Sequence, residues 1–192
     1  MGRIKHLAKV REFFQKTPIV NLNSLKKILG DSQDYVYLLI NKMLEHGEIK
    51  RITRSYYSIY DDPTLAVFCF KPAYLGLQNA LSIHNLWEQE TNVVILTTKK
   101  VRTGIRSIFG NNVLIRRVTS KFFFGFEYIK YGDFYVPVSD IEKTFLDLIY
   151  FNQPLSRETL RNICNRVDRK KLEGYLREYD SNISRKVKKM LK

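Results

Sequence analysis

Residues 33–45 carry side chains whose chemistry suits the recognition of nucleic acid. In a helix, the apolar residues of this stretch form one stripe, which leaves polar and aromatic side chains on the opposite face. Glutamine and asparagine can pair with adenine edges in the major groove of DNA, while tyrosine and lysine can reach phosphates. The residues that we expect on this outer face are Gln33, Tyr35, Tyr37, Asn41 and Lys42.

Basic residues on both sides of this stretch can supply phosphate contacts. Two lie on a predicted preceding helix, 25–29, which would cross the DNA backbone. Three lie on a predicted β-hairpin, where backbone or minor-groove contacts are expected. These basic residues are Lys26, Lys27, Lys50, Arg51 and Arg54.

Three helices and a hairpin must position these residues within 1–60. Helical spacing of apolar residues predicts helices over 4–16, 25–29 and 33–45, and residues 18–22 suit a brief strand. Asn23 or Ser24 can cap the second helix. Asp31 or Ser32 can cap the third, and the dipeptide 46–47 ends it.

The hairpin consists of two β-rich runs around the turn at 54–55. The exit from the third helix into this hairpin resembles that of the winged helix-turn-helix superfamily, in which this helix is the recognition helix. The residues that carry the resemblance are Leu44, Gly47, Ile49, Arg51, Ile52, Arg54 and Tyr57. Winged helices also serve as protein–protein modules, and acidic residues near the third helix keep that alternative open. They are Asp31, Asp34, Glu45 and Glu48.

The distribution of charge points to polyanionic partners at both ends of the chain. The 192 residues include 33 basic and 19 acidic ones, a net charge of +14. Residues 1–60 carry 11 basic and 5 acidic residues, 61–150 carry 10 and 9, and 151–192 carry 12 and 5. Two cationic surfaces on a near-neutral middle fit nucleic acid, and improved solubility is the alternative.

The middle of the chain predicts a second domain, 61–192, after the break at Asp61-Asp62-Pro63. We expect a strand or connector over 65–70 and a helix opened by Pro72. Strands are expected over 93–98 and 113–118, and a hairpin joins runs at 122–129 and 134–138. A further helix starts at a Ser139 or Asp140 cap, with Glu142 as the capping-box acid.

Three short amphipathic helices with basic outer faces are predicted in 151–192. Ser156 and Asp168 cap the first two, and the last begins at Ser181. Their faces are either simply solvated or contact DNA, an acidic partner or an RNA-binding partner. The basic residues expected on this C-terminal surface include Arg157, Arg161, Arg166, Arg169, Lys170 and Arg177.

Two motifs in the second domain resemble the AbiEi family, the antitoxins of type IV toxin–antitoxin systems in abortive infection. The first runs from Ala80 to Leu86 and matches a helix with a Leu-His-Gly-Leu-like exit, with Asn85 in place of the glycine. The second matches an Asp-x-Glu-Lys-Thr-x-x-Asp helix start at 140–147. The resemblance implies an N-terminal winged helix and a second domain that opposes a nucleotidyltransferase-like toxin.

The carboxylates of Asp140, Glu142 and Asp147 raise the alternative of a metal or acid–base site. A helix cap, a capping-box acid and an ion pair with Lys143 explain them without catalysis. His84 is interpreted as a capping or core histidine. The sequence contains no phosphate loop, zinc motif or nucleophile elbow. We therefore expect no catalytic residues, no metal, no cofactor and no enzyme.

Together these features predict an α+β protein: a winged helix-turn-helix, then a mixed α/β domain with a C-terminal helical bundle. The predicted function is an antitoxin that binds its own promoter as an autorepressor. The alternatives are a plain winged-helix regulator with a dimerisation or effector domain, or an RNA-binding protein. Two widely spaced cysteines and no apolar run of about 18 residues predict a cytoplasmic protein without a membrane partner.

Overall fold

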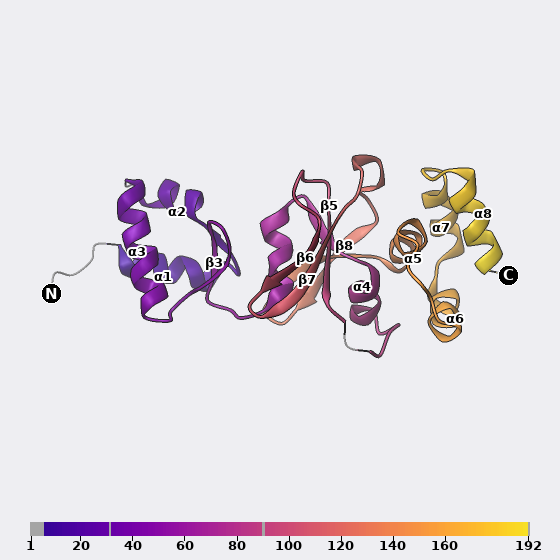
Figure 1. Cartoon of the computed structure of the whole chain (residues 1–192), viewed down its shortest axis with the longest axis horizontal. Helices are drawn as coiled ribbons and strands as arrows, with labels where there is room; N and C mark the ends of the chain where they lie inside the picture. The colour runs from indigo at the N-terminus through magenta and orange to yellow at the C-terminus, as the bar shows by residue number, and fades with distance from the viewer. Residues whose placement is uncertain (1–5, 31, 90, 192) are drawn as a thin grey trace. The chain divides into compact units, whose positions relative to one another are not determined.

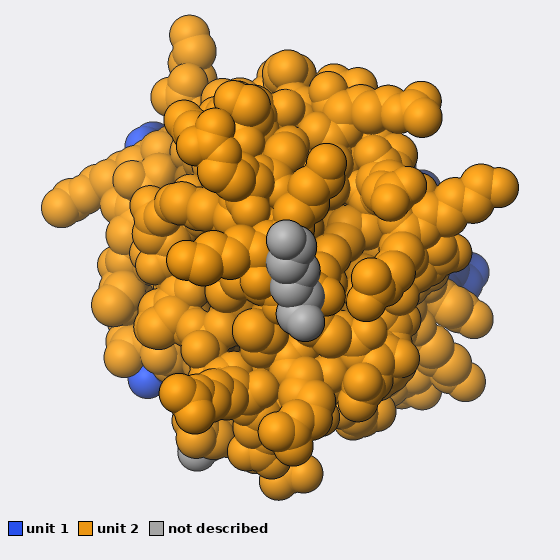
Figure 2. Space-filling view, turned by 90° about the vertical axis from the view of Figure 1, so that its right-hand side faces the viewer, with its two compact units in different colours: residues 1–69, 108–111 blue, residues 70–107, 112–192 orange. Residues whose placement is uncertain are grey.

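A computed structural model describes residues 6–30, 32–89 and 91–191, and the chain divides into two compact units (Figure 1). Unit 1 takes in the chain up to Cys69 together with residues 108–111. Unit 2 takes in residues 70–107 and the chain from Asn112 onward; Figure 2 colours the two units separately. Residues 61–69, which the sequence analysis assigns to the second domain, thus cluster with the first.

Unit 1 contains all the elements expected over 1–60. Its helices are α1 (Leu7–Lys16), α2 (Leu22–Leu29) and α3 (Gln33–Glu45), and its strands are β1 (Val20–Asn21), β2 (Lys50–Thr53) and β3 (Tyr56–Ser58). The strands form an antiparallel sheet in the order β1-β3-β2. The apolar stripes of the helices make its core, which includes Phe14, Leu25, Val36, Leu39, Ile40, Met43 and Tyr57.

Polar caps fix where these helices begin. The helix α2 starts three residues earlier than predicted because Asn21, and neither Asn23 nor Ser24, is its cap, accepting a hydrogen bond from the Asn23 N–H. Ser32 caps α3 by accepting from the Tyr35 N–H. The alternative cap Asp31 and the first residues of the predicted 4–16 helix lie outside the described residues.

Unit 2 is built on a mixed six-stranded sheet in the order β6-β7-β5-β4-β9-β8. The strands are β4 (Ala73–Leu75), β5 (Val93–Thr97), β6 (Gly104–Ile108), β7 (Asn111–Arg117), β8 (Phe126–Tyr131) and β9 (Phe134–Ser139). Parallel pairing joins β5 to β7 and β4 to β9, whereas β4–β5 and β8–β9 pair antiparallel.

Helices cover this sheet and gather around one of their number, α5 (Figure 1). They are α4 (Leu77–Ile83), α5 (Ile141–Tyr150), α6 (Arg157–Arg166), α7 (Arg169–Leu176) and α8 (Ser181–Met190), with a short 3-10 segment η2 (Ser120–Phe122). The three predicted C-terminal helices are therefore confirmed. The 3-10 segment η1 (Pro63–Phe70) belongs to unit 1 except for its last residue. The core between sheet and helices includes Tyr74, Leu81, Leu96, Phe145, Leu148 and Ile163.

Two expectations for the middle of the chain are wrong, and one strand was not expected. Residues 65–70 form a 3-10 helix rather than a strand or connector. The helix expected from Pro72 is delayed to Leu77 because residues 73–75 are buried as β4 between β5 and β9. The strand β6 was not predicted at all, since its two isoleucines are separated by Arg106 and Ser107 and form neither a hydrophobic run nor a strict alternation.

The fold class is α+β, as expected. Among the described residues, no helix is long and apolar enough to cross a membrane.

Candidate nucleic-acid interface

The outer face of α3 presents three of its five predicted contact residues to solvent. Gln33, Tyr37 and Asn41 are exposed, and Lys42 is half-buried. Tyr35 does not fit the prediction, because its ring packs partly against the unit 1 core and meets His6 edge-on at 6.3 Å. Tyr35 lies one residue before the buried Val36, at the edge of the apolar stripe. At this position a small rotation of the helix determines whether the side chain faces the core or the solvent.

Sequence reasoning missed one residue on this face, Leu38. Its side chain is 53% exposed, whereas the neighbouring Leu39 is 1% exposed. The signal was present in the sequence: Leu38 falls out of phase with the buried stripe of the helix. Together with polar neighbours it lines an open hollow of about 590 Å³ along α3. The hollow is lined by Asp34, Tyr37, Leu38, Asn41, Lys42, Glu45 and His46.

The predicted basic residues beside α3 are all exposed. Lys26 and Lys27 lie in the last turn of α2. Arg54 lies in the turn between β2 and β3, and the guanidinium of Arg51 lies 5.6 Å from the centre of the Tyr57 ring. Lys50 differs from the other basic residues named here in that its charge is partly neutralised, because its ammonium group forms an ion pair with Asp61.

One acidic residue near α3 is neutralised within unit 1. Glu48 accepts two hydrogen bonds of 2.7 Å from the guanidinium of Arg11, which ties α1 to the segment before β2. These bonds lower the pKa of the Glu48 carboxyl. Of the acidic residues that favoured a protein-binding role, Asp34 and Glu45 stand at opposite ends of the α3 face.

In unit 2, Lys143 and Asp147 form a fully buried ion pair on α5, confirming the expected pairing. Asp147 also accepts a 2.8 Å hydrogen bond from the Tyr74 hydroxyl of β4, and Lys143 donates to the Tyr179 hydroxyl at 3.2 Å. Burial lowers the pKa of Lys143 and raises those of Asp147 and Tyr74. All four polar groups therefore have partners inside the core.

The first turn of α5 holds the helix α7. Asp140 caps α5 through the Lys143 N–H, as predicted, and accepts a 2.8 Å bond from the Tyr175 hydroxyl. Glu142 is not a capping-box acid: it lies at the second position of the helix, one short of the capping-box position, and instead accepts the Asp168 N–H at 2.7 Å. Lys171 forms ion pairs with both carboxylates, at 3.1 and 3.2 Å.

The carboxylates of the 140–147 motif thus each have a structural partner. Among the described residues, no group of three or more His, Cys, Asp and Glu side chains could hold a metal ion. His84 ends α4, as expected of a capping histidine, and its Nε2 lies 2.7 Å from the Ser139 carbonyl oxygen. The arrangement joins α4, α5 and α7 rather than exposing reactive groups.

The basic side chains predicted for the C-terminal helices are exposed. Figure 2 looks onto this end of unit 2, where several extended side chains project from the surface. One of the predicted residues, Arg166, donates a hydrogen bond to the His84 carbonyl oxygen. The exposed residues are Arg157, Arg161, Arg166, Arg169, Lys170 and Arg177.

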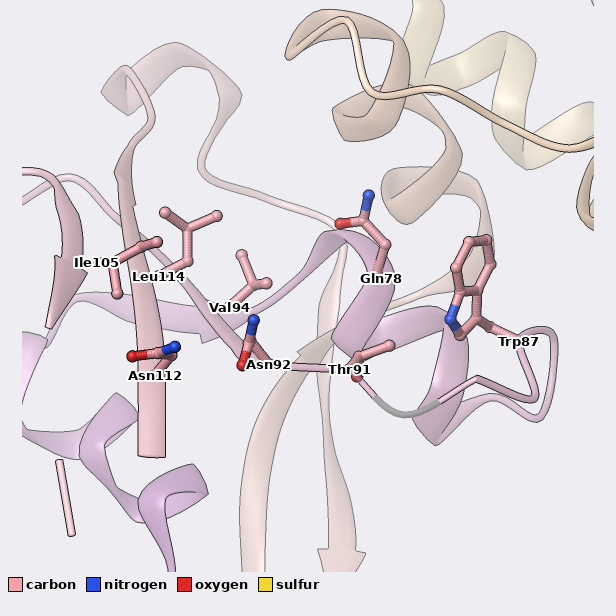
Figure 3. A pocket seen from close by; sticks show the side chains of 8 residues that line it. All are labelled: Gln78, Trp87, Thr91, Asn92, Val94, Ile105, Asn112 and Leu114. Atoms are coloured by element: carbon pink, nitrogen blue, oxygen red, sulfur yellow. The ribbon is translucent and has the colours of Figure 1, made fainter. Parts of the chain in front are cut away.

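A pocket of about 220 Å³ lies in unit 2 beside the starts of β5 and β7 (Figure 3). The amide side chain of Asn112 lies at one end, that of Asn92 lies in the middle, and the Trp87 ring lies at the other end. Within the described part of the chain, the buried indole N–H of Trp87 has no hydrogen-bond partner. The lining residues are Gln78, Trp87, Thr91, Asn92, Val94, Ile105, Asn112 and Leu114.

No protein-family model matches the chain, and no curated protein sequence matches it.

Proposed function

We propose that unit 1 is a winged helix-turn-helix that binds double-stranded DNA, and that the protein represses its own promoter. The order α1-β1-α2-α3-β2-β3, with β1 paired to the hairpin strand β3, carries this proposal. In that arrangement α3 is the recognition helix and the β2–β3 hairpin is the wing. The exposed cations of α2 and the wing supply the phosphate contacts.

We further propose that unit 2 acts as an antitoxin against a nucleotidyltransferase-like toxin. The support is the resemblance of 80–86 and 140–147 to the AbiEi motifs. Asn85 adds to it: its backbone is left-handed, with φ of 55°, at the position where the family pattern has glycine. Asparagine tolerates this conformation better than most residues, so the replacement keeps the helix exit. Neutralisation proceeds by direct contact with the toxin or through its target or product.

The first experiment measures binding to the protein's own upstream DNA and to a scrambled duplex across a salt series. Phosphate contacts alone give a steep salt dependence on both duplexes, whereas base recognition adds a difference between them. We expect a difference that persists at physiological salt. Equal, salt-sensitive binding to both duplexes would contradict sequence-specific DNA recognition.

The second experiment separates the two proposed activities. Reversing the wing charges, Arg51→Glu with Arg54→Glu, is expected to weaken promoter binding while rescue from the co-expressed toxin persists. The matched control reverses two exposed lysines of unit 2, Lys121→Glu with Lys130→Glu, and is expected to leave promoter binding intact. Loss of both activities in a folded wing variant would contradict the division between the units.

The pocket in unit 2 favours a second candidate function, a winged-helix regulator with an effector-binding domain. Its mixed lining of amides and aliphatic side chains suits a small polar ligand (Figure 3). Co-expression with the neighbouring gene discriminates between the candidates. Promoter binding without rescue from any neighbouring gene product would favour the regulator over the antitoxin.

A further inference from the structure

We infer that Leu38 is a specificity-determining residue of the proposed DNA-binding surface, and that it contacts the C5 methyl group of a thymine in the major groove. The inference rests on the proposed function of unit 1 and names part of the DNA sequence that it recognises.

Leu38 takes no part in the core of unit 1. The four residues of the buried stripe of α3 are each at most 1% exposed, and they account for the packing of this helix on its neighbours. Leu38 lies in the middle of the opposite face and keeps 53% of its surface exposed. Its neighbour Tyr37 is 38% exposed, so the centre of this face is apolar while its ends are polar.

A single exposed leucine is common on protein surfaces, so exposure alone decides nothing. Two polar residues within one helical turn of Leu38 give it a context, because each matches a chemical group on a base edge. Asn41, three residues later, matches the N6 and N7 groups of adenine, and Asp34, four residues earlier, can accept from the amino group of cytosine. Among the groups that bases present in the major groove, the thymine methyl is the one that suits an apolar partner.

The spacing along α3 sets which bases are read together. Residues three apart on a helix have Cβ atoms about 5–6 Å apart, and base pairs along DNA are about 3.4 Å apart. Leu38 and Asn41 therefore fall over the same or neighbouring base pairs. We expect the recognised site to contain a thymine within one or two steps of an adenine that contacts Asn41.

The hollow along α3 itself holds Asp34 and Glu45 beside Lys42, but the exposed lysines at the end of α2, a helix that contacts α3, and the exposed arginines of the hairpin add positive charge to unit 1. Glu48, the acidic residue beside the hairpin, is already neutralised by Arg11. The major groove of DNA complements an apolar side chain in a unit that carries exposed positive charge, because it is bordered by phosphates and has thymine methyl groups on its floor.

The test replaces each thymine of the upstream duplex in turn with deoxyuridine, which removes only the methyl group. For the unmodified protein, we expect one position to lose affinity by about fourfold, the effect of burying one methyl group. The variant Leu38→Ala should bind the normal duplex more weakly and should no longer respond to deoxyuridine at that position. Its circular dichroism should match that of the unmodified protein.

The control is Ile59→Ala, which truncates another exposed aliphatic side chain of unit 1, 37% exposed and outside α3. It should keep the full response to deoxyuridine. Preference for the upstream duplex without any deoxyuridine response, or a response that survives Leu38→Ala, overturns this inference alone. Equal binding to upstream and scrambled duplexes overturns the proposed function with it. A change in oligomeric state of Leu38→Ala, with DNA binding unchanged, shows instead that Leu38 contacts protein.

Discussion

The ammonium group of Lys143 pairs with the carboxylate of Asp147 one turn further along α5, and neither side chain is exposed to solvent. Tyr74 from β4 and Tyr179 from the segment between α7 and α8 complete the hydrogen bonding around this pair. The pair therefore joins the sheet, α5 and the C-terminal helices at one point. A motif that first suggests acid–base chemistry serves here to position the last third of unit 2.

Breaking this pair is expected to destabilise unit 2 strongly. Asp147→Asn leaves the buried ammonium group without its carboxylate, and loss of one partner of a buried pair costs about 3–5 kcal/mol in the free energy of unfolding. Urea denaturation followed by circular dichroism measures this loss. The double variant Lys143→Met with Asp147→Leu should be less destabilised than Asp147→Asn, because it leaves no unpaired charge.

The matched control is the exposed pair of Lys16 and Glu12, which has the same spacing on α1. Lys16→Gln should change the free energy of unfolding far less than Asp147→Asn does, since water screens the exposed pair. Similar small losses for Asp147→Asn and Lys16→Gln would show that the buried pair does not hold unit 2 together.

The turn before β8 leaves no room for a side chain at Gly125. A Cβ there would lie 2.9 Å from the Cβ of Lys143 and 3.0 Å from Cε2 of Tyr175, and φ is +66°. Gly125→Ala should therefore cost about 1–2 kcal/mol for the left-handed backbone and a further 1–3 kcal/mol for overpacking. Thermal or urea unfolding measures both contributions together.

Gly132 provides the comparison that separates these contributions. It also has a positive φ, +57°, but a Cβ there would meet nothing within 4 Å. Gly132→Ala should show the backbone cost alone. Equal losses for the two alanine variants would mean that α5 and α7 yield to make room at Gly125.

Unit 2 is expected to lose stability in alkaline solution through Tyr175. Burial and the hydrogen bond to Asp140 raise the pKa of its hydroxyl to about 12, from an ordinary value of about 10. Below both values the hydroxyl is neutral in both states, and its contribution is complete. Between them the unfolded chain releases the proton while the folded chain keeps it, so stability falls as the pH rises through this window.

The variant Tyr175→Phe tests this assignment, because it lacks the titrating group. Unmodified protein should be the more stable of the two at pH 8, and urea midpoints should converge as the pH approaches the folded pKa. A difference between the two proteins that stays constant across the window would assign the alkaline loss to other groups.

The sequence predicted unit 1 well because its signals are local. Helix periodicity, a serine cap and a two-residue turn each act within a few residues, and all of them correspond to what the structure contains. The predictions fail where an adjoining element of the fold determines the cap or the orientation of a side chain. Asn21 became the cap of α2 because the backbone enters from β1, and the phase of α3 turned Tyr35 toward the core.

Unit 2 was less predictable because partners distant in sequence decide its structure. The segment 73–75 reads as the start of a helix, yet it pairs with β5 and β9, whose residues lie about 20 and 60 positions away. Spacing along α5 correctly predicted that Lys143 meets Asp147. The same spacing could not predict the partner of Glu142, because that partner is the N–H of Asp168, the cap residue of α7.

Phosphate contacts by α2 are expected to appear in the salt dependence of DNA binding. Lys26 and Lys27 are exposed at the helix end. Each phosphate contact contributes about 0.9 to the slope of log affinity against log salt concentration. Lys26→Ala with Lys27→Ala should thus reduce the slope by up to about 2. Affinity should fall by the same factor for upstream and scrambled duplexes, because these contacts read no bases. Lys16→Ala, which removes one exposed positive charge at the end of α1, serves as the control and should leave the slope unchanged. An unchanged slope for the α2 variant would place the DNA on another surface of unit 1, and an equal reduction for Lys16→Ala would show that only the overall charge matters.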